Sequence, residues 1–170
     1  MNIFYLHKDP KKCAEMHCDK HVVKMILEYA QLLSTAHHEI DGEPSVECYK
    51  PTHKNHPSAV WARSNRSNYN WLYLLLKGLC SEYTLRYGKV HKTERSGIVH
   101  GLSFPPYEMK PGEFFDPPQC MDDYCKVEGD AITAYHNYYI REKSYMACWK
   151  FTQEPVWYTI GMASEMKEAG

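Results

Sequence analysis

The stretch CDKHVVKMILEYAQLL, residues 18–33, combines residue types and a spacing that could support amine chemistry. It carries two lysines, a glutamate and a glutamine at intervals of four, four and three residues: Lys20, Lys24, Glu28 and Gln31. Because an α-helix has about 3.6 residues per turn, these intervals place all four side chains on one face. Two neighbouring amines repel each other's charge, which favours a neutral, nucleophilic amine. A carboxylate one turn further along can take up and return protons.

A second interpretation of this stripe is an ordinary exposed helix edge. The remaining residues of the stretch are mostly apolar and cover well over half of the helix circumference, so the helix must pack on most sides. Only the stripe is left to face solvent or a cleft. On an exposed edge, Lys24 and Glu28 form an i,i+4 ion pair worth a few tenths of a kcal/mol. The spacing alone leaves both interpretations open.

A metal site is another possible chemistry. Cys13, His17 and His21 repeat every four residues, and Cys120 and Cys125 could add ligands. Zinc needs a fourth converging ligand, and the sequence contains neither a CxxC nor an HExxH motif. Reduced core cysteines and surface histidines explain the pattern as well. We therefore expect no metal and no cofactor.

The candidate residues require two long helices to position them. Asp9-Pro10 is a helix start, and the helical periodicity continues to about His37 before Gly42 and Pro44 end it. Asn55-His56-Pro57 starts a second helical region, with a break or kink at 64–68 and an end at Gly88. The apolar start 3–6 is expected to be a strand or an extended segment on the core.

The second half of the chain is less regular. Residues 92–128 contain three proline-rich pairs and are predicted to form a long loop, which in a compact domain is usually functional or mobile. Asp130 can cap a third helix, 131–147, whose tyrosines we expect in the core, and the tail at 155–157 should dock back. The prediction is a mainly α, single compact domain, 1–170, with a helical core at about 10–90 and 130–170 and a loop-rich insertion at about 92–128.

Composition excludes several protein classes. Hydrophobic residues make up 44% and aromatic residues 14% of the chain, as in a globular protein. No apolar run reaches the roughly 18 residues of a membrane span. The start MNIFYLHKDP lacks the basic and apolar regions of a secretory signal. Seven cysteines without a regular framework favour reduced thiols, so we expect a cytoplasmic protein that does not bind membranes.

The charge distribution is asymmetric although the formal net charge is only −1. Basic residues are in excess in 1–95, and acidic residues are in excess in 96–170. The most basic segment, 50–92, has Glu82 as its single acid and alternates basic with aromatic residues: Lys50, Lys54, Arg63, Arg66, Lys77, Arg86, Lys89 and Lys92 among Trp61, Tyr69, Trp71, Tyr73, Tyr83 and Tyr87. Such a mixture suits a phosphate backbone with unstacked bases. A solvated helix face beside an aromatic core gives the same mixture.

Three motifs together resemble a known family. They are Lys20-x3-Lys24-x3-Glu28-x2-Gln31, the segment Asn55-His56-Pro57-x3-Trp61, and Leu79-Cys80-x-Glu82-Tyr83-Thr84-x-Arg86-x-Gly88. Their order and spacing over about 18–88 resemble the small bacterial proteins grouped with the pyrimidine-dimer DNA glycosylases. The whole chain is also similar to small proteins of tailed bacteriophages.

The resemblance implies an α-helical DNA-repair enzyme of the glycosylase and abasic-site lyase type. Such enzymes attack C1′ of a damaged nucleotide with an amine, and the resulting Schiff base allows strand cleavage by β-elimination. Glu28 matches the glutamate that stabilises the sugar cation. The nucleophile would be the amine of Met1, Lys20 or Lys24, since this chain begins Met1-Asn2. Nucleic-acid contacts are expected from Gln31, His21, Lys54, Asn55, His56, Trp61, Arg63, Arg66, Glu82 and Arg86.

Two other functions stay open. One is an enzyme, expected in the host bacterial cytoplasm if the chain is a phage protein, that modifies nucleotides or DNA bases in the same pocket, with Trp61 or Tyr83 stacking on the base. The other is a non-enzymatic module that binds DNA or a host protein through Lys54, Arg63 and Arg66. The partner is therefore duplex DNA with a damaged or modified pyrimidine, a nucleotide, or a protein. The oligomeric state is left open.

Overall fold

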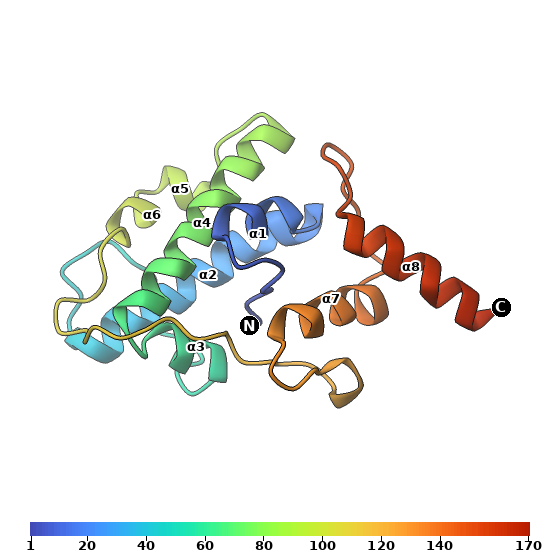
Figure 1. Cartoon of the computed structure of the whole chain (residues 1–170). Helices are drawn as coiled ribbons and strands as arrows, with labels where there is room; N and C mark the ends of the chain where they lie inside the picture. Colours follow the sequence, from blue (N-terminus) through green and yellow to red (C-terminus); the bar gives the residue numbers. More distant parts are fainter.

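Two long antiparallel helices, α2 and α4, form the centre of the molecule (Figure 1). The structure is a computed structural model that describes residues 1–170, and it confirms the mainly α fold, with no strand. The elements are α1 Pro10–Met16, α2 Asp19–Asp41, α3 Pro57–Ala62, α4 Arg66–Tyr87, α5 Lys92–Arg95, α6 Ile98–Gly101, the 3-10 helix η1 Asp123–Cys125, α7 Ala131–Glu142 and α8 Val156–Ala169. None of the helices combines the length and the apolar character needed to cross a bilayer.

The pairing of α2 with α4 is antiparallel because contacts join opposite ends. His37, near the end of α2, bonds the Tyr69 hydroxyl near the start of α4 at 2.8 Å. Asp19, at the start of α2, bonds Arg86 at the end of α4 at 3.1 Å. Helix α1 packs across α4 so closely that a Cβ at Gly78 would lie 2.8 Å from that of Ala14. Glycine therefore permits this close approach.

The helical periodicity from Pro10 to His37 does not form one helix. His17 has extended backbone angles (φ −61°, ψ 132°), and α2 begins two residues later. The carbonyls of Glu15 and His17 accept hydrogen bonds from Arg86 at 2.9 and 2.8 Å, in place of continued helical bonding. The second helical region, which starts at Pro57, is broken between Ala62 and Arg66, as its polar residues predict. Its two parts are capped by His56 and Asn65, whose side chains accept from the backbone amides of Ser58 and Asn68.

The segment 92–128 is more structured than a loop, since it contains α5, α6 and η1. Its extended part is fixed by side chains of the central helices. Arg66 donates to the carbonyls of Met109 and Tyr107 at 2.6 and 3.1 Å, and Trp61 Nε1 donates to the carbonyl of Phe115 at 2.8 Å. Helix α7 ends at Glu142, short of the predicted 147.

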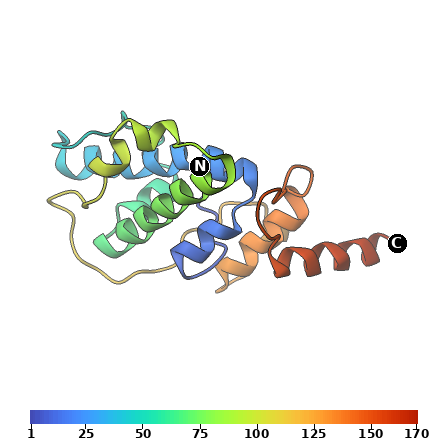
Figure 2. The same cartoon turned by 90° about the horizontal axis from the view of Figure 1, so that it is seen from above.

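The two chain ends meet the core differently. The start of the chain is extended and buried from Ile3 to Leu6, and Figure 1 shows it between the central helices and α7. Helix α8 packs on α7 and projects from the edge of the molecule (Figure 2). The extended start therefore leads residues 1 and 2 towards the groove between α2 and α7.

Candidate active site

A pocket of about 320 Å³ opens where the chain start, α2 and the end of α7 meet. The residues that line it combine amines, a carboxylate, an imidazole and a thiol: Met1, Asn2, Phe4, His21, Lys24, Met25, Glu28, Cys120, Tyr138 and Lys143. Three predicted catalytic residues, Met1, Lys24 and Glu28, are thus brought together. A larger hollow of about 540 Å³ lies between α7 and α8, but its Arg141 and Glu165 pair with each other at 3.4 Å.

A closed hydrogen-bond cluster holds the chain start in place. His17 Nδ1 donates to the carbonyl of Cys13 at 2.7 Å, so its Nε2 is left to accept from the Tyr29 hydroxyl at 2.8 Å. The Tyr29 oxygen in turn accepts from the amide of Phe4 at 3.0 Å, and Cys13 Sγ donates to the carbonyl of Phe4 at 3.1 Å. All four residues are buried, and burial lowers the pKa of His17 to about 4. A neutral His17 is what the cluster requires.

The next residues of the chain start are fixed from two more helices. His136 of α7 donates from Nε2 to the carbonyl of Leu6 at 2.9 Å. Trp71 of α4 donates from Nε1 to the carbonyl of Lys8 at 2.8 Å. Side chains from α1, α2, α4 and α7 therefore hold an extended segment that makes no sheet, and Met1 and Asn2 lie at its open end.

His21 forms the floor of the pocket as a neutral imidazole. Its ring stacks on Phe4, with centroids 4.1 Å apart and 23° between the planes. Burial, and then electrostatic repulsion from the neighbouring His17, Lys143 and Lys24 when His21 takes up a proton, lower the pKa of His21 to about 2. The Tyr139 hydroxyl accepts from the amide of Cys18 at 3.2 Å and lies 2.6 Å from His21 Nδ1. When Tyr139 donates to Nδ1, Nε2 of His21 carries the proton and is a neutral donor.

The pocket has an excess of basic groups, because its lining residues carry three amines and one carboxylate. Lys24 Nζ lies 4.0 Å from Glu28 Oε2; the Lys24 side chain is 70% exposed and that of Glu28 is 20% exposed. The amine of Met1 is close enough to His56 to influence it. Partial burial first, and then the charge of this amine, lower the pKa of His56. The Asn-His-Pro segment thus lies near the chain start.

Other predicted site residues lie outside this pocket. Lys20 is exposed and Gln31 is half-buried on α2, but neither lines the pocket. Trp61 is buried, with its ring against those of Trp71 and Phe114.

Lys54 and Asn55 are exposed. The side chain of Arg63 is half-buried, and its Nη1 atom is buried without a hydrogen-bond partner. Contacts between these residues and nucleic acid stay predictions.

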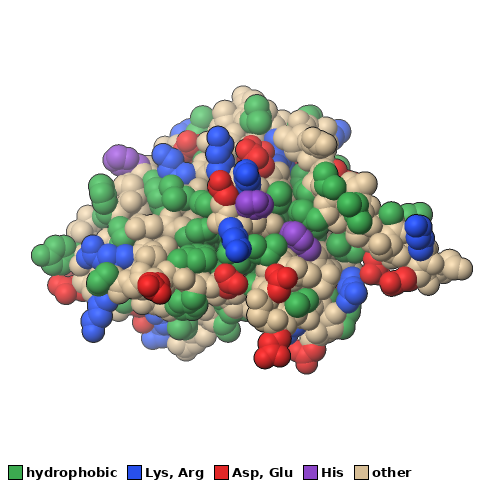
Figure 3. All heavy atoms as spheres, viewed as in Figure 1, with side chains coloured by type: hydrophobic (Ala, Val, Ile, Leu, Met, Phe, Trp, Pro, Cys, Tyr) green, Lys and Arg blue, Asp and Glu red, His purple; other side chains and the backbone are tan.

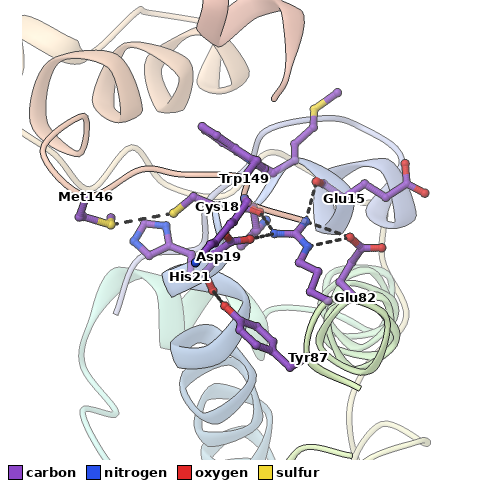
Figure 4. A network of polar contacts seen from close by, with 12 residues as sticks. Glu15, Cys18, Asp19, His21, Glu82, Tyr87, Met146 and Trp149 are labelled. Carbon is purple, nitrogen blue, oxygen red and sulfur yellow. Dashed lines mark hydrogen bonds and ion pairs between the residues drawn. The ribbon is translucent and has the colours of Figure 1, made fainter. Parts of the chain in front are cut away.

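Arg86 and Glu82 lie in a buried ion network at the junction of α1, α2 and α4 (Figure 4). The Arg86 side chain is 0% exposed and donates to Glu82 Oε1 at 2.9 Å and to Asp19 Oδ1 at 3.1 Å. The other carboxylate oxygen of Asp19 accepts from the amide of Lys150 at 2.7 Å. The network therefore joins the start of α2, two residues before His21, to α4 and to the segment after α7.

The candidate metal ligands are used in other contacts. Cys13 and His17 belong to the cluster around Phe4, and His21 bonds Tyr139. No three His, Cys, Asp or Glu side chains are arranged to hold a metal ion, and all seven cysteines are free thiols.

The structure adds pocket residues that the sequence did not suggest. Phe4, Tyr138 and Lys143 line the pocket, and so does Cys120, which the sequence offered only as a metal ligand; three of these four residues come from the second half of the chain. Of the tyrosines expected in the core, Tyr135 and Tyr139 are buried, but Tyr138 is only half-buried and Tyr145, beyond the end of α7, is exposed. Helical periodicity could have distinguished Tyr138 from the buried Tyr135 and Tyr139, but no sequence pattern distinguishes Lys143 from other lysines.

Comparison with known proteins gives one match. No curated protein and no solved structure matches the chain. The sequence model of the family described as pyrimidine dimer DNA glycosylase matches residues 1–95, which is more than half of the chain. The matched part contains α1 to α4, the chain start and Glu28. This chain belongs to the pyrimidine dimer DNA glycosylase family.

Proposed function

We propose that the protein is a DNA glycosylase with abasic-site lyase activity, acting on damaged or modified pyrimidines through an amine of the pocket. One observation carries this proposal: Met1, Lys24 and Glu28 line the same pocket. An amine nucleophile and a carboxylate within one pocket are the groups that this chemistry needs. Family membership supports DNA as the substrate.

The proposed reaction begins with the Met1 amine. Its lone pair forms a bond to C1′ of the nucleotide, and the C1′–N bond to the base breaks, so that the base leaves with the electron pair and gains a proton. Loss of a proton from the amine and opening of the sugar ring give the Schiff base. Removal of a C2′ proton then breaks the C3′–O bond and releases the phosphate. Glu28 stabilises the cationic sugar and carries the protons.

Two arguments favour Met1 over the lysines. As a class, α-amino groups are about two to three pH units less basic than lysine side chains, so far more of them are neutral at pH 7. Lys24 is mostly exposed and faces Glu28, and Lys20 does not line the pocket. We propose that Lys20 and Lys24, and Lys54 with Asn55, His56 and Arg63, contact the DNA around the pocket.

Four of the predicted nucleic-acid contacts have a different role in this proposal. Trp61, Arg66, Glu82 and Arg86 already contact protein groups, and we propose that they support the DNA-binding surface without touching DNA. On the face seen in Figure 3, basic side chains alternate with acidic ones. This face therefore has no broad basic surface, and we propose that the positive charge at the pocket places the DNA.

Borohydride trapping tests this function. Purified protein is incubated with a labelled duplex that carries one abasic site, reduced with sodium borohydride, and mapped by peptide analysis. We expect a cross-link at Met1, and a trapping rate at least about 100-fold lower for Glu28→Gln. Lys167→Gln, an exposed change on α8, is the matched control and should trap at the normal rate.

Each other outcome has a defined meaning. A cross-link at Lys24 would overturn the assignment of Met1. Normal trapping by Glu28→Gln would overturn the role of Glu28. If the protein binds DNA but forms no cross-link, it is a DNA-binding module and not an enzyme of this type. If DNA does not bind but a nucleotide raises the melting temperature, the pocket belongs to a nucleotide-modifying enzyme.

A further inference from the structure

The pocket contains a lysine from outside the part of the chain that matches the family. Lys143 is the residue that follows α7, and it lines the pocket together with Met1, Lys24 and Glu28. It is half-buried and takes part in none of the ion pairs of the molecule. Its ammonium therefore has no carboxylate partner within the protein and can pair with the negative charge of a ligand.

Aromatic rings fix the position of this ammonium. Lys143 Nζ lies 5.2 Å from the centre of the Tyr138 ring. The Tyr138 ring stacks on Phe4 with centroids 6.0 Å apart and 18° between the planes, and Phe4 stacks on His21. The same stack therefore connects the lysine to the wall of the pocket on α2. Such a contact holds the charge in place while leaving its N–H groups free to donate.

The surrounding charges indicate the kind of ligand. Lys24 and Lys143 line the pocket together with the Met1 amine, and Glu28 is its single carboxylate, so an anion is favoured in the pocket. The positive charge of Lys143 also reaches the pocket floor, where it contributes to the lowered pKa of His21. Burial first, and then these charges, keep His21 neutral, so that its ring can donate a hydrogen bond beside the lysine amines. An ammonium and a neutral imidazole N–H together suit the oxygens of a phosphodiester.

We propose that Lys143 is a phosphate-positioning residue, which holds the phosphodiester next to the sugar that the pocket amine attacks. This inference rests on the proposed function and adds that the second half of the chain completes the site. Lys143 itself forms no bond to C1′. Its role is to fix the sugar at reacting distance from the amine of Met1 and the carboxylate of Glu28.

Three variants test this assignment through DNA binding: Lys143→Gln removes the charge, Lys143→Arg keeps it, and Lys167→Gln is the control on an exposed helix. The probe is a duplex with a tetrahydrofuran abasic analogue, titrated over a range of salt concentrations. Lys143→Gln should raise Kd about tenfold, the value of one charged hydrogen bond. It should also reduce the slope of log K against log salt concentration by about one. Lys143→Arg and the control should keep the normal slope.

Borohydride trapping at saturating DNA separates positioning from covalent chemistry. Lys143→Gln should still form the cross-link, and only the DNA concentration needed should rise. A complete loss of the cross-link at saturation, in a variant with a normal melting temperature, would make Lys143 the nucleophile and overturn the inference. An unchanged Kd and salt slope would overturn it as well.

A second measurement does not depend on the reaction. The NMR signals of the His21 ring are followed while inorganic phosphate is added. They should move in the wild type and in Lys143→Arg, and stay fixed in Lys143→Gln. If the wild type shows this response but neither binds nor cleaves abasic DNA, the proposed function fails and the phosphate site stands. If the wild type cleaves DNA but phosphate leaves His21 unaffected in every variant, the site fails and the function stands.

Discussion

Replacing Arg86 with methionine should lower the free energy of unfolding by about 3 to 5 kcal/mol. The wild-type side chain is 0% exposed and donates to Asp19, to Glu82 and to the carbonyls of Glu15 and His17, all within 3.1 Å. The carboxylates of Asp19 and Glu82 are only 12% and 10% exposed. Methionine fills much of the volume but leaves these two charges and two carbonyls without a donor. The cost therefore comes from the partners that stay buried.

Urea unfolding followed by circular dichroism measures this loss directly. For a domain of this size, about 3 to 5 kcal/mol corresponds to a melting temperature lower by about 6 to 20 °C. Lys77→Met changes an exposed position of the same helix and should shift stability by less than about 0.5 kcal/mol. Adding Glu82→Gln to Arg86→Met should recover at least about 1 kcal/mol, because it removes one of the stranded charges.

A different result would refute the reasoning. If Arg86→Met loses less than about 1 kcal/mol but binds abasic DNA poorly, then Arg86 is a DNA contact and the buried network is not a stabilising one. The family resemblance alone suggested such a contact. Failure of Glu82→Gln to recover any stability would likewise show that the cost does not come from an unpaired carboxylate.

Three further changes test the positions of the chain start and α1. Tyr29→Phe leaves the Phe4 amide and His17 Nε2 buried without partners, so stability should fall by about 1 to 3 kcal/mol and borohydride trapping should slow; normal trapping would show that this cluster does not position the amine. Burial lowers the pKa of His17 to about 4, so between pH 6.5 and pH 5 the unfolded chain binds a proton there that the folded chain does not. His17 should therefore account for a fall in stability of about 1.5 kcal/mol over this range, and His21, whose pKa is lowered to about 2, for a similar fall; urea unfolding that gives equal values at both pH values would contradict neutral imidazoles at these two positions. Gly78→Ala should lose about 1 kcal/mol because its Cβ would meet that of Ala14 at 2.8 Å, although alanine favours helices; a higher melting temperature would show that α1 can move away.

Local patterns in the sequence predicted the parts of the site that lie on one helix. Lys24 and Glu28 are a single turn apart, so helical periodicity placed them on one face before any long-range contact was known. The polar cluster at 64–68 located the break before α4 in the same way, and its Asn65 bonds an amide only three residues away. The resemblance to a glycosylase family, based on short motifs in the first half of the chain, is confirmed by the match over residues 1–95.

Features that depend on distant partners could not be read from the sequence. The helix predicted from Pro10 to His37 breaks because Arg86, 69 residues after His17, takes the carbonyl of His17. Trp61 is covered by an extended segment 54 residues later, whose path no periodicity defines. Lys143 has no sequence pattern that distinguishes it from a surface lysine. Such contacts are fixed by packing between elements, on which local spacing carries no information.

The second half of the chain helps to line the pocket and to hold the chain start, and is not an appendage to the family core. The family match ends at residue 95, yet His136 holds the carbonyl of Leu6, and Tyr139 holds both the amide of Cys18 and the ring of His21. An extended segment outside a sheet has no strand partner to hold its backbone. Ordering it costs about 1 to 2 kcal/mol of conformational entropy for each residue. Bonds from α7 supply part of what orders it. The chain start and Glu28 can therefore line one pocket only when both halves are folded together.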